Sequence, residues 1–576
     1  MSRFQSIYDI AQLCAKKGLS KAVLCPGSRC APLTLAFTRH PDIQCKTFSD
    51  ERSAGFVAMG LSQSSGEPTV LVCTSGTAAY NFAPAVAESF FSKIPLIVLT
   101  ADRPTEWIGQ LDGQTIYQTG IFGKHVKGSY QLPQEYEHPD NGWAINRIVN
   151  DAINLACQEP RGPVHINAPF REPLYPTSTD VFSYSIDVRV IDDAQAILEL
   201  DSTQAEKLIN AWPTFHNILM VAGQLKLNSA LLTSLNNFLD THNIPLVGDI
   251  ISNLHPIEKL VRHSDLFLGQ CGSEVLQTLK PDLLITFGES TISKNLKLFL
   301  RKYNPKEHWH IQAAGDVADT FQHVTKIIRC TPEKFFDLLS STGNTESFEN
   351  QRQNNYQKLW EIEERRVLRA LHEHLDSKEF GELEVVNEII ESLPPGSNLH
   401  LANSMSVRYA NFIGLKSTHQ DVKVFANRGT SGIDGCTSTV VGHALSGDAL
   451  NVLITGDQAF FYDRNAFWHN YSLPNLRVVL LNNHGGIIFK MIDGPGDTPE
   501  AAEYFITDQR LNANSLSNEF GIEYLKLDNK RKLKNLVRDF FECDGKARIL
   551  EFESDLTLNR ELFENLKQKI RKSYEL

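Results

Sequence analysis

The chain has 576 residues, more than one hydrophobic core supports, and its length predicts three or four domains. Lysine and arginine number 56 against 68 aspartates and glutamates, and the net charge of −12 argues against a general nucleic-acid-binding protein. The ten cysteines form no CxxC pair, which indicates reduced thiols. The N-terminus has no signal pattern, and no apolar run approaches the roughly 20 residues of a membrane span. The sequence therefore predicts a cytoplasmic protein that does not enter a membrane.

The first third of the chain alternates strand and helix signals. A helix is expected over 8–17, and apolar runs predict strands at 21–25, 69–73, 95–100 and 163–168. Such alternation favours a parallel, doubly wound sheet. Polar residues follow the strand ends, which is the edge where these sheets bind ligands. We expect an α/β domain over 1–180.

The remaining chain predicts two more domains of the same α/β class. After a linker at about 173–191, strands at 217–222, 244–246 and 281–287 indicate a central domain over 190–342. A polar stretch at 343–353 is expected to be a second linker, and the charge run 363–366 in the next helix a solvated face. A third domain is expected over 376–576, ending in an exposed terminal helix.

Two strand ends in the third domain predict a metal and diphosphate site. The apolar run 451–455 ends at Gly456 and Asp457, and the run 477–481 ends at Asn483 and Gly485. Parallel strands joined by a helix place their carboxyl ends on the same edge of a sheet, so these groups should meet. A carboxylate, an amide oxygen and a backbone carbonyl suit Mg²⁺, and the helix that begins at Asp457 offers N–H groups to phosphates.

Glu51, in the first domain, is a second candidate functional residue, far from this site in the sequence. Glu51 opens a helix in the first domain, where a glutamate is also common for dipole reasons alone. Together with Gly456-Asp457 and Asn483, 26 residues after Asp457, it resembles the thiamine diphosphate-dependent enzymes over the whole chain. The resemblance implies a thiamine diphosphate-binding fold in which the first domain holds the aminopyrimidine and the last holds the Mg²⁺ (or Mn²⁺) diphosphate.

The same resemblance assigns cofactor residues. Glu51 would be the catalytic carboxylate that favours the imino tautomer of the cofactor, and Ile433 would hold the cofactor in its bent conformation. Gln458 stands where many relatives have glycine. The metal ligands would be Asp457, Asn483 and the Gly485 carbonyl. The implied cofactor-binding residues are Glu51, Thr77, Ser431, Gly432, Ile433, Gly456, Asp457, Gln458, Asn483, Gly485 and Gly486.

Five further motifs resemble the MenD family, the 2-succinyl-5-enolpyruvyl-6-hydroxy-3-cyclohexene-1-carboxylate (SEPHCHC) synthases of menaquinone biosynthesis. They are the segments 25–34, 100–104, 292–294, 403–408 and 427–435. The resemblance implies a transferase that decarboxylates 2-oxoglutarate on thiamine diphosphate, releases CO₂ and adds the succinyl-type carbanion to isochorismate. It also implies a homo-oligomer, at least a dimer and possibly a tetramer, in which Glu51 serves the site of a neighbouring chain.

Both substrates are dicarboxylates, and arginine supplies the paired donors that a buried carboxylate needs. By resemblance, Ser404, Arg408 and Arg428 would hold the carboxylate of the succinyl unit. Ile488 and Phe489 would form an apolar wall over the reacting groups. The residues expected to face isochorismate are Ser28, Arg29, Arg103, Gln114 and Lys294. Gly113 stands where relatives often carry asparagine, and Asn295 where some carry a second base.

Two other interpretations stay open at the level of sequence. Another thiamine diphosphate-dependent 2-oxoacid decarboxylase or an acetohydroxyacid synthase-like lyase would use one small 2-oxoacid and would hold a flavin in its central domain. A metabolite-binding regulator on the same fold would not need Glu51. The histidines at 308, 310, 372 and 374 are expected to be structural, with no metal site and no role as a general base.

Overall fold

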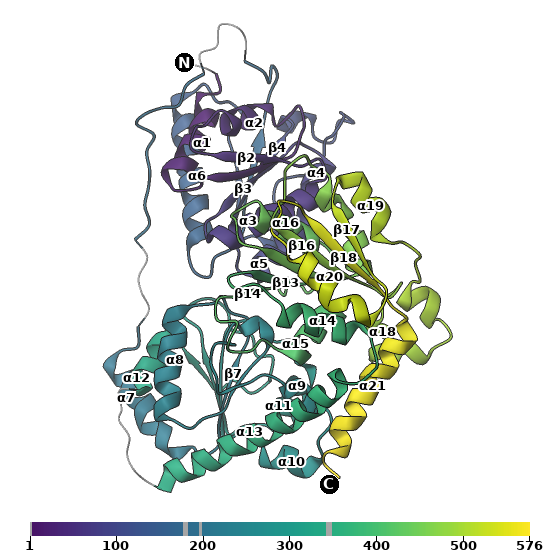
Figure 1. Ribbon diagram of the computed structural model, residues 1–576. Coiled ribbons are helices and arrows are strands. Elements are labelled where there is room, and N and C mark those ends of the chain that lie inside the picture. Colours follow the sequence, from purple (N-terminus) through teal and green to yellow (C-terminus); the bar gives the residue numbers. More distant parts are fainter. Residues whose placement is uncertain (1–2, 177–181, 195–198, 341–347, 493, 576) are drawn as a thin grey trace.

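Three six-stranded sheets, each with helices on its faces, build the computed structural model, and every strand pair is parallel (Figure 1). The structure describes residues 3–176, 182–194, 199–340, 348–492 and 494–575. The α/β class with three doubly wound sheets is confirmed. We infer that the three units are the domains expected over 1–180, 190–342 and 376–576, and we refer to them as the N-terminal, middle and C-terminal domains.

The N-terminal sheet has the strand order β2-β1-β3-β4-β6-β5. Its strands are β1 Lys21–Leu24, β2 Gln44–Thr47, β3 Thr69–Cys73, β4 Leu96–Asp102, β5 Ser129–Gln131 and β6 Val164–Pro169. Its helices are α1 Gln5–Lys16, α2 Ala31–Thr38, α3 Glu51–Ser65, α4 Thr77–Asn81, α5 Ala83–Phe91 and α6 Pro139–Cys157. β3 and β4 are buried along their whole length, as central parallel strands covered on both faces must be.

The middle sheet has the order β12-β11-β10-β7-β8-β9. Its strands are β7 Ile218–Ala222, β8 Leu246–Gly248, β9 Leu260–Val261, β10 Leu283–Phe287, β11 Glu307–Ile311 and β12 Lys326–Ile328. Its helices are α7 Ser202–Ala211, α8 Ser229–Thr241, α9 Ser264–Leu268, α10 Ser273–Thr278, α11 Lys294–Lys302 and α12 Pro332–Ser340. The histidines of β11 are buried, and Thr286 on β10 contacts His308 and His310 at 2.8 Å each.

The C-terminal sheet has the order β14-β13-β15-β16-β18-β17. Its strands are β13 Asn398–Leu401, β14 Lys423–Phe425, β15 Asn451–Gly456, β16 Leu476–Asn482, β17 Glu523–Leu527 and β18 Arg548–Glu553. Its helices are α14 Glu382–Glu391, α15 Met405–Ile413, α16 Cys436–Ala444, α17 Asp457–Tyr462, α18 Ile488–Met491, α19 Ala513–Phe520, α20 Leu533–Phe540 and α21 Leu556–Lys572, with a π-helix over Ala501–Ile506.

Both expected linkers are more ordered than the sequence suggests. In the first, residues 177–181 lie outside the described residues, but Phe182 packs on Tyr8 with ring centroids 4.1 Å apart, and the Ser185 amide donates to Asp9 at 2.8 Å. In the second, 343–347 lie outside the described residues. The rest, 348–353, opens the long helix α13 Phe348–Leu375, so the linker prediction is wrong there.

Helix α13 also corrects the expected solvated charge run. Glu363 and Glu364 are buried, and Glu364 accepts hydrogen bonds from the backbone amides of Arg262 and His263. The terminal helix α21 lies beside α13 (Figure 1) and buries Ile570, so one of its faces is not exposed as predicted. Charged side chains on these helices therefore join parts of the chain that are far apart in sequence.

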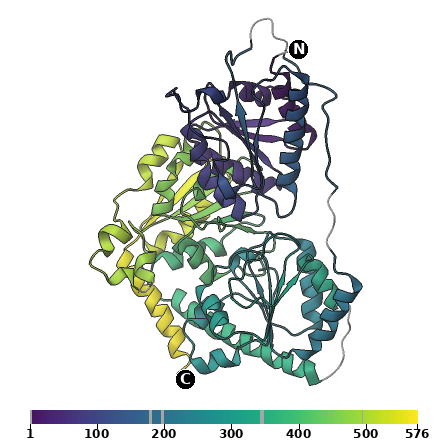
Figure 2. The same ribbon diagram turned by 180° about the vertical axis from the view of Figure 1, so that it is seen from behind.

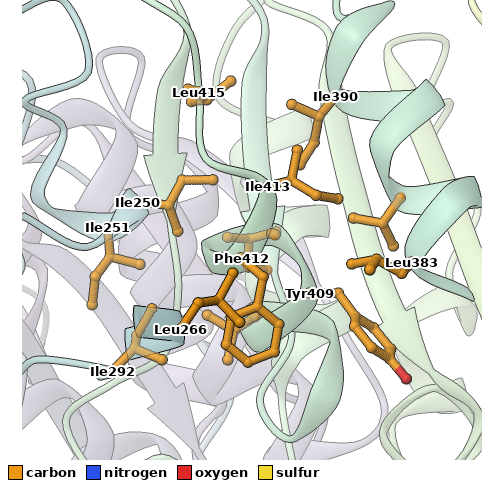
Figure 3. Close-up of a cluster of buried hydrophobic side chains, with 14 of the residues drawn as sticks. Ile250, Ile251, Leu266, Ile292, Leu383, Ile390, Tyr409, Phe412, Ile413 and Leu415 are labelled. Atoms are coloured by element: carbon orange, nitrogen blue, oxygen red, sulfur yellow. The ribbon is translucent and has the colours of Figure 1, made fainter. Parts of the chain in front are cut away.

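The C-terminal domain contacts both other domains (Figure 2). Its core is continuous with that of the middle domain, where Ile250 and Leu266 lie beside Phe412 of α15 (Figure 3). On the other side α16 packs on α3 of the N-terminal domain. A Cβ atom at Gly60 would lie 2.1 Å from the Thr439 carbonyl oxygen, so glycine is required for this backbone contact.

The strands expected from apolar runs are confirmed, with ends shifted by one or two residues. The short strands β5, β9, β12 and β14 were not expected, since two or three residues carry no periodic pattern, and the longer strands β13, β17 and β18 were also missed. Among the described residues, no helix is both long enough and apolar enough to cross a membrane.

Candidate active site

Asp457 and Asn483 lie at the same edge of the C-terminal sheet. β15 and β16 are neighbouring parallel strands, with Gly456 opposite Leu481 in the register. Asp457 is the first residue of α17, and Asn483 follows β16 directly. Both side chains are buried. The topology thus places the two predicted metal ligands at the ends of neighbouring parallel strands.

The polar groups at this edge fit a divalent cation. Asn483 donates from Nδ2 to Glu382 at 2.8 Å, and its Oδ1 is buried without a hydrogen-bond partner among the described residues. Burial raises the pKa of Asp457 to about 6, against the hydrogen bond that Gln509 donates at 2.6 Å. A buried carboxylate and an orphaned amide oxygen are both groups that a cation would stabilise.

The glycines after Asn483 are held tightly by the π-helix. The Gly485 carbonyl accepts the Ile487 amide at 3.0 Å, which leaves it a second lone pair. A Cβ atom at Gly485 would lie 2.6 Å from Ile506, and the Gly486 amide donates to the Ile506 carbonyl at 2.6 Å. Within the described residues no group of three or more His, Cys, Asp or Glu side chains could hold a metal ion, so a site here needs amide and carbonyl oxygens.

A cavity of about 740 Å³ adjoins this edge. Asn483, Gln509 and Ser554 line it on the sheet side, and the basic residues Lys490 and Arg510 line it as well. Phe489 packs on Phe505 with ring centroids 5.9 Å apart, while Ile488 is half-buried beside it. Asp508 and Asp555 line it too, so the cavity offers charges of both signs together with oxygen ligands for a metal-bound diphosphate.

Two arginines lie on neighbouring segments of the same domain. Arg408 on α15 donates to the Ser404 carbonyl at 2.5 Å, and Arg428 donates to Asn403 Oδ1 at 2.8 Å. Burial lowers the pKa of both guanidinium groups, and Arg408 lowers that of Arg428 further. The Arg428 Nε is buried without a partner among the described residues. Asp265 acts on Arg408, and Asp249 and Glu88 act on Arg428, but among the described residues neither guanidinium forms an ion pair within 4.0 Å, and a bound carboxylate would supply one.

The segment after Arg428 holds the predicted cofactor residues Ser431, Gly432 and Ile433. Asn403 donates from Nδ2 to the carbonyls of Asn427 at 2.7 Å and Gly432 at 2.6 Å, which closes the segment into a loop. Ile433 is 38% exposed, so it is not an ordinary core residue. An exposed isoleucine on a fixed loop suits contact with a ligand.

A second basic cluster forms at the carboxyl edge of the N-terminal sheet. Arg29 is buried and donates to the Phe170 carbonyl at 2.9 Å, while Arg103 pairs with Asp112 at 3.3 Å. Burial lowers the pKa of Arg29, and the nearby Arg103 charge lowers it further. Gln114 lies against Gly76, where a Cβ atom would be 3.3 Å from its Cα. Ser28 is exposed beside Arg29.

Glu51 and Lys294 are two further charged residues of the predicted site, and each begins a helix. Glu51 is half-buried at the start of α3 and accepts a 3.3 Å hydrogen bond from Asn81, with Thr77 exposed at the start of α4. Lys294 is exposed at the start of α11 in the middle domain.

Three predicted site residues adopt positive φ, a conformation that costs free energy for a residue other than glycine. They are Gln114 at 57°, Ser404 at 72° and Ser431 at 61°, and His484, next to Asn483, has a φ of 62°. Five other described non-glycine residues also have positive φ: Lys93, Leu111, Asn253, Gln322 and Thr507.

Four residues that hold the loops and the predicted metal ligands of the candidate site were not singled out from the sequence. They are Glu88, Glu382, Asn403 and Gln509. Glu382 is buried, and burial raises its pKa to about 7. Each is an ordinary polar residue within a helix or loop, and no local pattern distinguishes it. Only Asn403, next to Ser404 in a motif already noted, had a signal that could have found it.

Comparison with protein-family models defines the class of protein. Residues 8–125 match the model described as thiamine pyrophosphate enzyme, N-terminal TPP binding domain. Residues 193–401 match the model described as middle domain of thiamine pyrophosphate. Three α/β domains with these matches, and a site that fits a metal-bound diphosphate, define a thiamine diphosphate-dependent enzyme.

Curated relatives identify the family. A protein of Cytophaga hutchinsonii named 2-succinyl-5-enolpyruvyl-6-hydroxy-3-cyclohexene-1-carboxylate synthase is 44% identical over 571 residues, 99% of this chain and 100% of the relative. Proteins of the same name from Bacteroides thetaiotaomicron and Flavobacterium johnsoniae are 35% and 36% identical over 98% and 96% of this chain, and over 99% and 97% of their own lengths. The chain belongs to the SEPHCHC synthase, or MenD, family.

Proposed function

We propose that this protein is a SEPHCHC synthase of menaquinone biosynthesis. It decarboxylates 2-oxoglutarate, releases CO₂ and joins the remaining succinyl unit to isochorismate. Beyond family membership, the observation that carries the proposal is the pair Arg408 and Arg428, two half-buried arginines on neighbouring segments whose charges form no ion pair within 4.0 Å among the described residues. A substrate with a second carboxylate, as 2-oxoglutarate has, would compensate them.

Thiamine diphosphate is the proposed cofactor, with Mg²⁺ or Mn²⁺ bound to its diphosphate. Asp457, the free Oδ1 of Asn483 and the Gly485 carbonyl would hold the metal. The backbone of Gly456, Gln458 and Gly486 would face the diphosphate, where the start of α17 exposes N–H groups. When bound, the cofactor supplies the nucleophilic carbon that the decarboxylation needs.

Glu51 is the proposed catalytic carboxylate, with Thr77 beside it. It would accept a proton from, or share one with, the pyrimidine ring, and its half-buried position leaves an oxygen for that contact. Ile433, exposed at the end of its loop, would support the bent cofactor, and Ser431 and Gly432 would contact it through their backbone.

The substrates would occupy opposite sides of the cofactor. Ser404, Arg408 and Arg428 would bind the distal carboxylate of 2-oxoglutarate. Ile488 and Phe489 would exclude water from the reacting carbon, which limits protonation in place of carbon–carbon bond formation. The residues proposed to bind isochorismate are Ser28, Arg29, Arg103, Gln114 and Lys294.

A homo-oligomer, at least a dimer and possibly a tetramer, is proposed as the active form. Within one chain, Arg52 next to Glu51 donates to the Tyr462 carbonyl at 2.8 Å, at the end of α17 opposite to Asp457. The shared site, in which the Glu51 of one chain faces the Asp457 of another, rests on the family resemblance. All ten cysteines are free thiols, which supports a cytoplasmic location.

The experiment is an assay of purified protein with MgCl₂, thiamine diphosphate, 2-oxoglutarate and isochorismate. Isochorismate should be consumed and CO₂ released only when 2-oxoglutarate and the cofactor are both present. Formation of acetolactate from pyruvate alone, or a bound flavin in the purified protein, would overturn the proposal. Sedimentation of the active enzyme would separate dimer from tetramer.

A further inference from the structure

Glu88 of the N-terminal domain binds the loop that carries Arg428. Its carboxylate is almost completely buried, with 1% of the residue exposed. One oxygen accepts the Gly429 amide at 2.8 Å, and the other accepts the Thr430 amide at 2.7 Å and the Thr430 hydroxyl at 2.6 Å. Ser92, one turn further along the chain, donates to the first oxygen at 2.7 Å. Both carboxylate oxygens are used, and three of these four bonds cross the domain boundary.

The backbone contact at the same place is independent of the carboxylate. A Cβ atom at Gly429 would lie 2.7 Å from the Glu88 carbonyl oxygen and 2.9 Å from the Ser92 amide nitrogen. Real side chains do not approach backbone atoms so closely, so only glycine fits. The loop therefore packs directly on the end of α5, and the Glu88 carboxylate fixes the position of the loop along that helix.

The other sides of the loop are held by the remaining domains. Asn403 of the C-terminal domain binds the carbonyls of Asn427 and Gly432 and accepts from Arg428. From the middle domain, Ser290 donates to the Arg428 carbonyl at 3.4 Å, and Gln224 donates to the Ala426 carbonyl at 2.9 Å. Among these contacts Glu88 supplies the carboxylate, and it is the residue that binds Gly429 and Thr430.

We propose that Glu88 is a positioning residue for 2-oxoglutarate and cofactor binding. By fixing the Gly429–Thr430 backbone it orients the Arg428 guanidinium on one side and Ser431, Gly432 and Ile433 on the other. This inference rests on the proposed function. A charged acceptor is needed because all three loop groups are donors. An uncharged glutamine would turn an N–H group toward at least one of them.

The test compares Glu88→Gln and Thr430→Val with the wild-type holoenzyme. Glu88→Gln should raise the KM for 2-oxoglutarate and the Kd for thiamine diphosphate with MgCl₂ by roughly tenfold or more, the loss expected for one charge-assisted hydrogen bond. The KM for isochorismate should not change, because Arg29 and Arg103 lie on other loops. Thr430→Val removes one bond and should shift the same two constants less. In the variant that carries both substitutions, the free-energy changes derived from these two constants should be smaller than the sum for the single variants, because both substitutions break the same contact.

Glu364→Gln is the matched control, because it removes another buried carboxylate at a domain junction without touching the loop. It should lower the Tm and leave both constants unchanged. If Glu88→Gln has a lower Tm but keeps the wild-type KM for 2-oxoglutarate and Kd for thiamine diphosphate, Glu88 is only structural and the inference is wrong. If Glu88→Gln does not fold, wild-type constants in Thr430→Val would refute it. A wild-type protein without synthase activity would instead refute the proposed function.

Discussion

Glu382 holds the amide of Asn483 by a 2.8 Å hydrogen bond to Nδ2 and so fixes the direction of the Oδ1 atom, which meets no other described protein group. Ser554 donates to the same Glu382 oxygen at 3.1 Å, and the Glu382 amide donates to Asn559 at 2.9 Å. The backbone and one carboxylate oxygen of Glu382 are thus held by hydrogen bonds. An amide held in this way is ready to bind a cation without losing rotamer freedom.

Glu382→Ala should therefore weaken metal binding. Without its acceptor the Asn483 amide can rotate, and loss of such an outer partner commonly costs about 10–100-fold in metal affinity. The measurement is a titration of the protein and thiamine diphosphate with Mn²⁺, followed by electron paramagnetic resonance. Glu382→Gln keeps an acceptor oxygen and should retain most of the affinity. Equal Mn²⁺ affinity in wild type and Glu382→Ala would show that Glu382 does not orient the ligand.

A second prediction concerns the buried pair of Glu364 and His263, whose Oε1 and Nδ1 are 2.6 Å apart. Burial by itself would lower the pKa of His263, but the Glu364 charge and hydrogen bond outweigh it and raise that pKa above 6.5. Burial likewise opposes ionisation of Glu364, yet His263 holds the pKa of Glu364 below 4.5. The two pKa shifts have opposite signs, and both favour the charged form of the residue, as one ion pair requires.

The pair should stabilise the protein most between about pH 4.5 and 6.5. The His263 contribution is complete below the unfolded pKa and is lost as pH rises through the raised folded value. The Glu364 contribution is complete above its unfolded pKa and is lost as pH falls through the lowered value. Glu364→Gln should cost about 3 kcal/mol in that window. Thermal scans at several pH values should show that the Tm difference between wild type and Glu364→Gln shrinks above the pKa that His263 has in the folded protein. A Tm difference that does not change with pH would contradict the ion pair.

The sequence predicted the parts of the fold that depend on long apolar runs. β3, β7 and β10 appear where those runs lie, because fully buried parallel strands need continuous apolar residues. The strand-end rule also placed Asp457 beside Asn483. The prediction failed for Glu364, since a buried ion pair and a solvated charge look alike until the partner, about 100 residues away, is known.

Residues of the candidate site could be predicted only where they belong to a short sequence motif. Asp457 and Asn483 belong to short motifs at strand ends. Glu88 and Glu382 act through residues that are 341 and 101 positions away, and no pattern in a single sequence connects them. Long-range hydrogen bonds of this kind are set by how the domains pack.

A third prediction tests Glu51. Glu51→Gln should lower kcat by about 100-fold or more, the usual contribution of a general acid–base group. The fold should be unchanged, because Glu51 is half-buried and its side chain makes one long bond, to Asn81. Steady-state assays and a Tm measurement check both points. A Glu51→Gln protein with wild-type kcat would favour a regulator rather than an enzyme.

The last prediction separates Arg408 from an ordinary surface arginine. Arg408→Ala should raise the KM for 2-oxoglutarate by an amount that corresponds to about 1.5–3 kcal/mol, since a charged hydrogen bond to the distal carboxylate would be lost. Arg365→Ala is the control, because Arg365 is exposed and pairs with Glu361 at 3.0 Å one helical turn away. Such exposed pairs contribute little, so this variant should keep both the KM and the Tm. Monocarboxylic 2-oxobutyrate, which lacks the distal carboxylate, should be used equally poorly by wild type and Arg408→Ala. A large difference between the two proteins with 2-oxobutyrate would mean that Arg408 acts elsewhere.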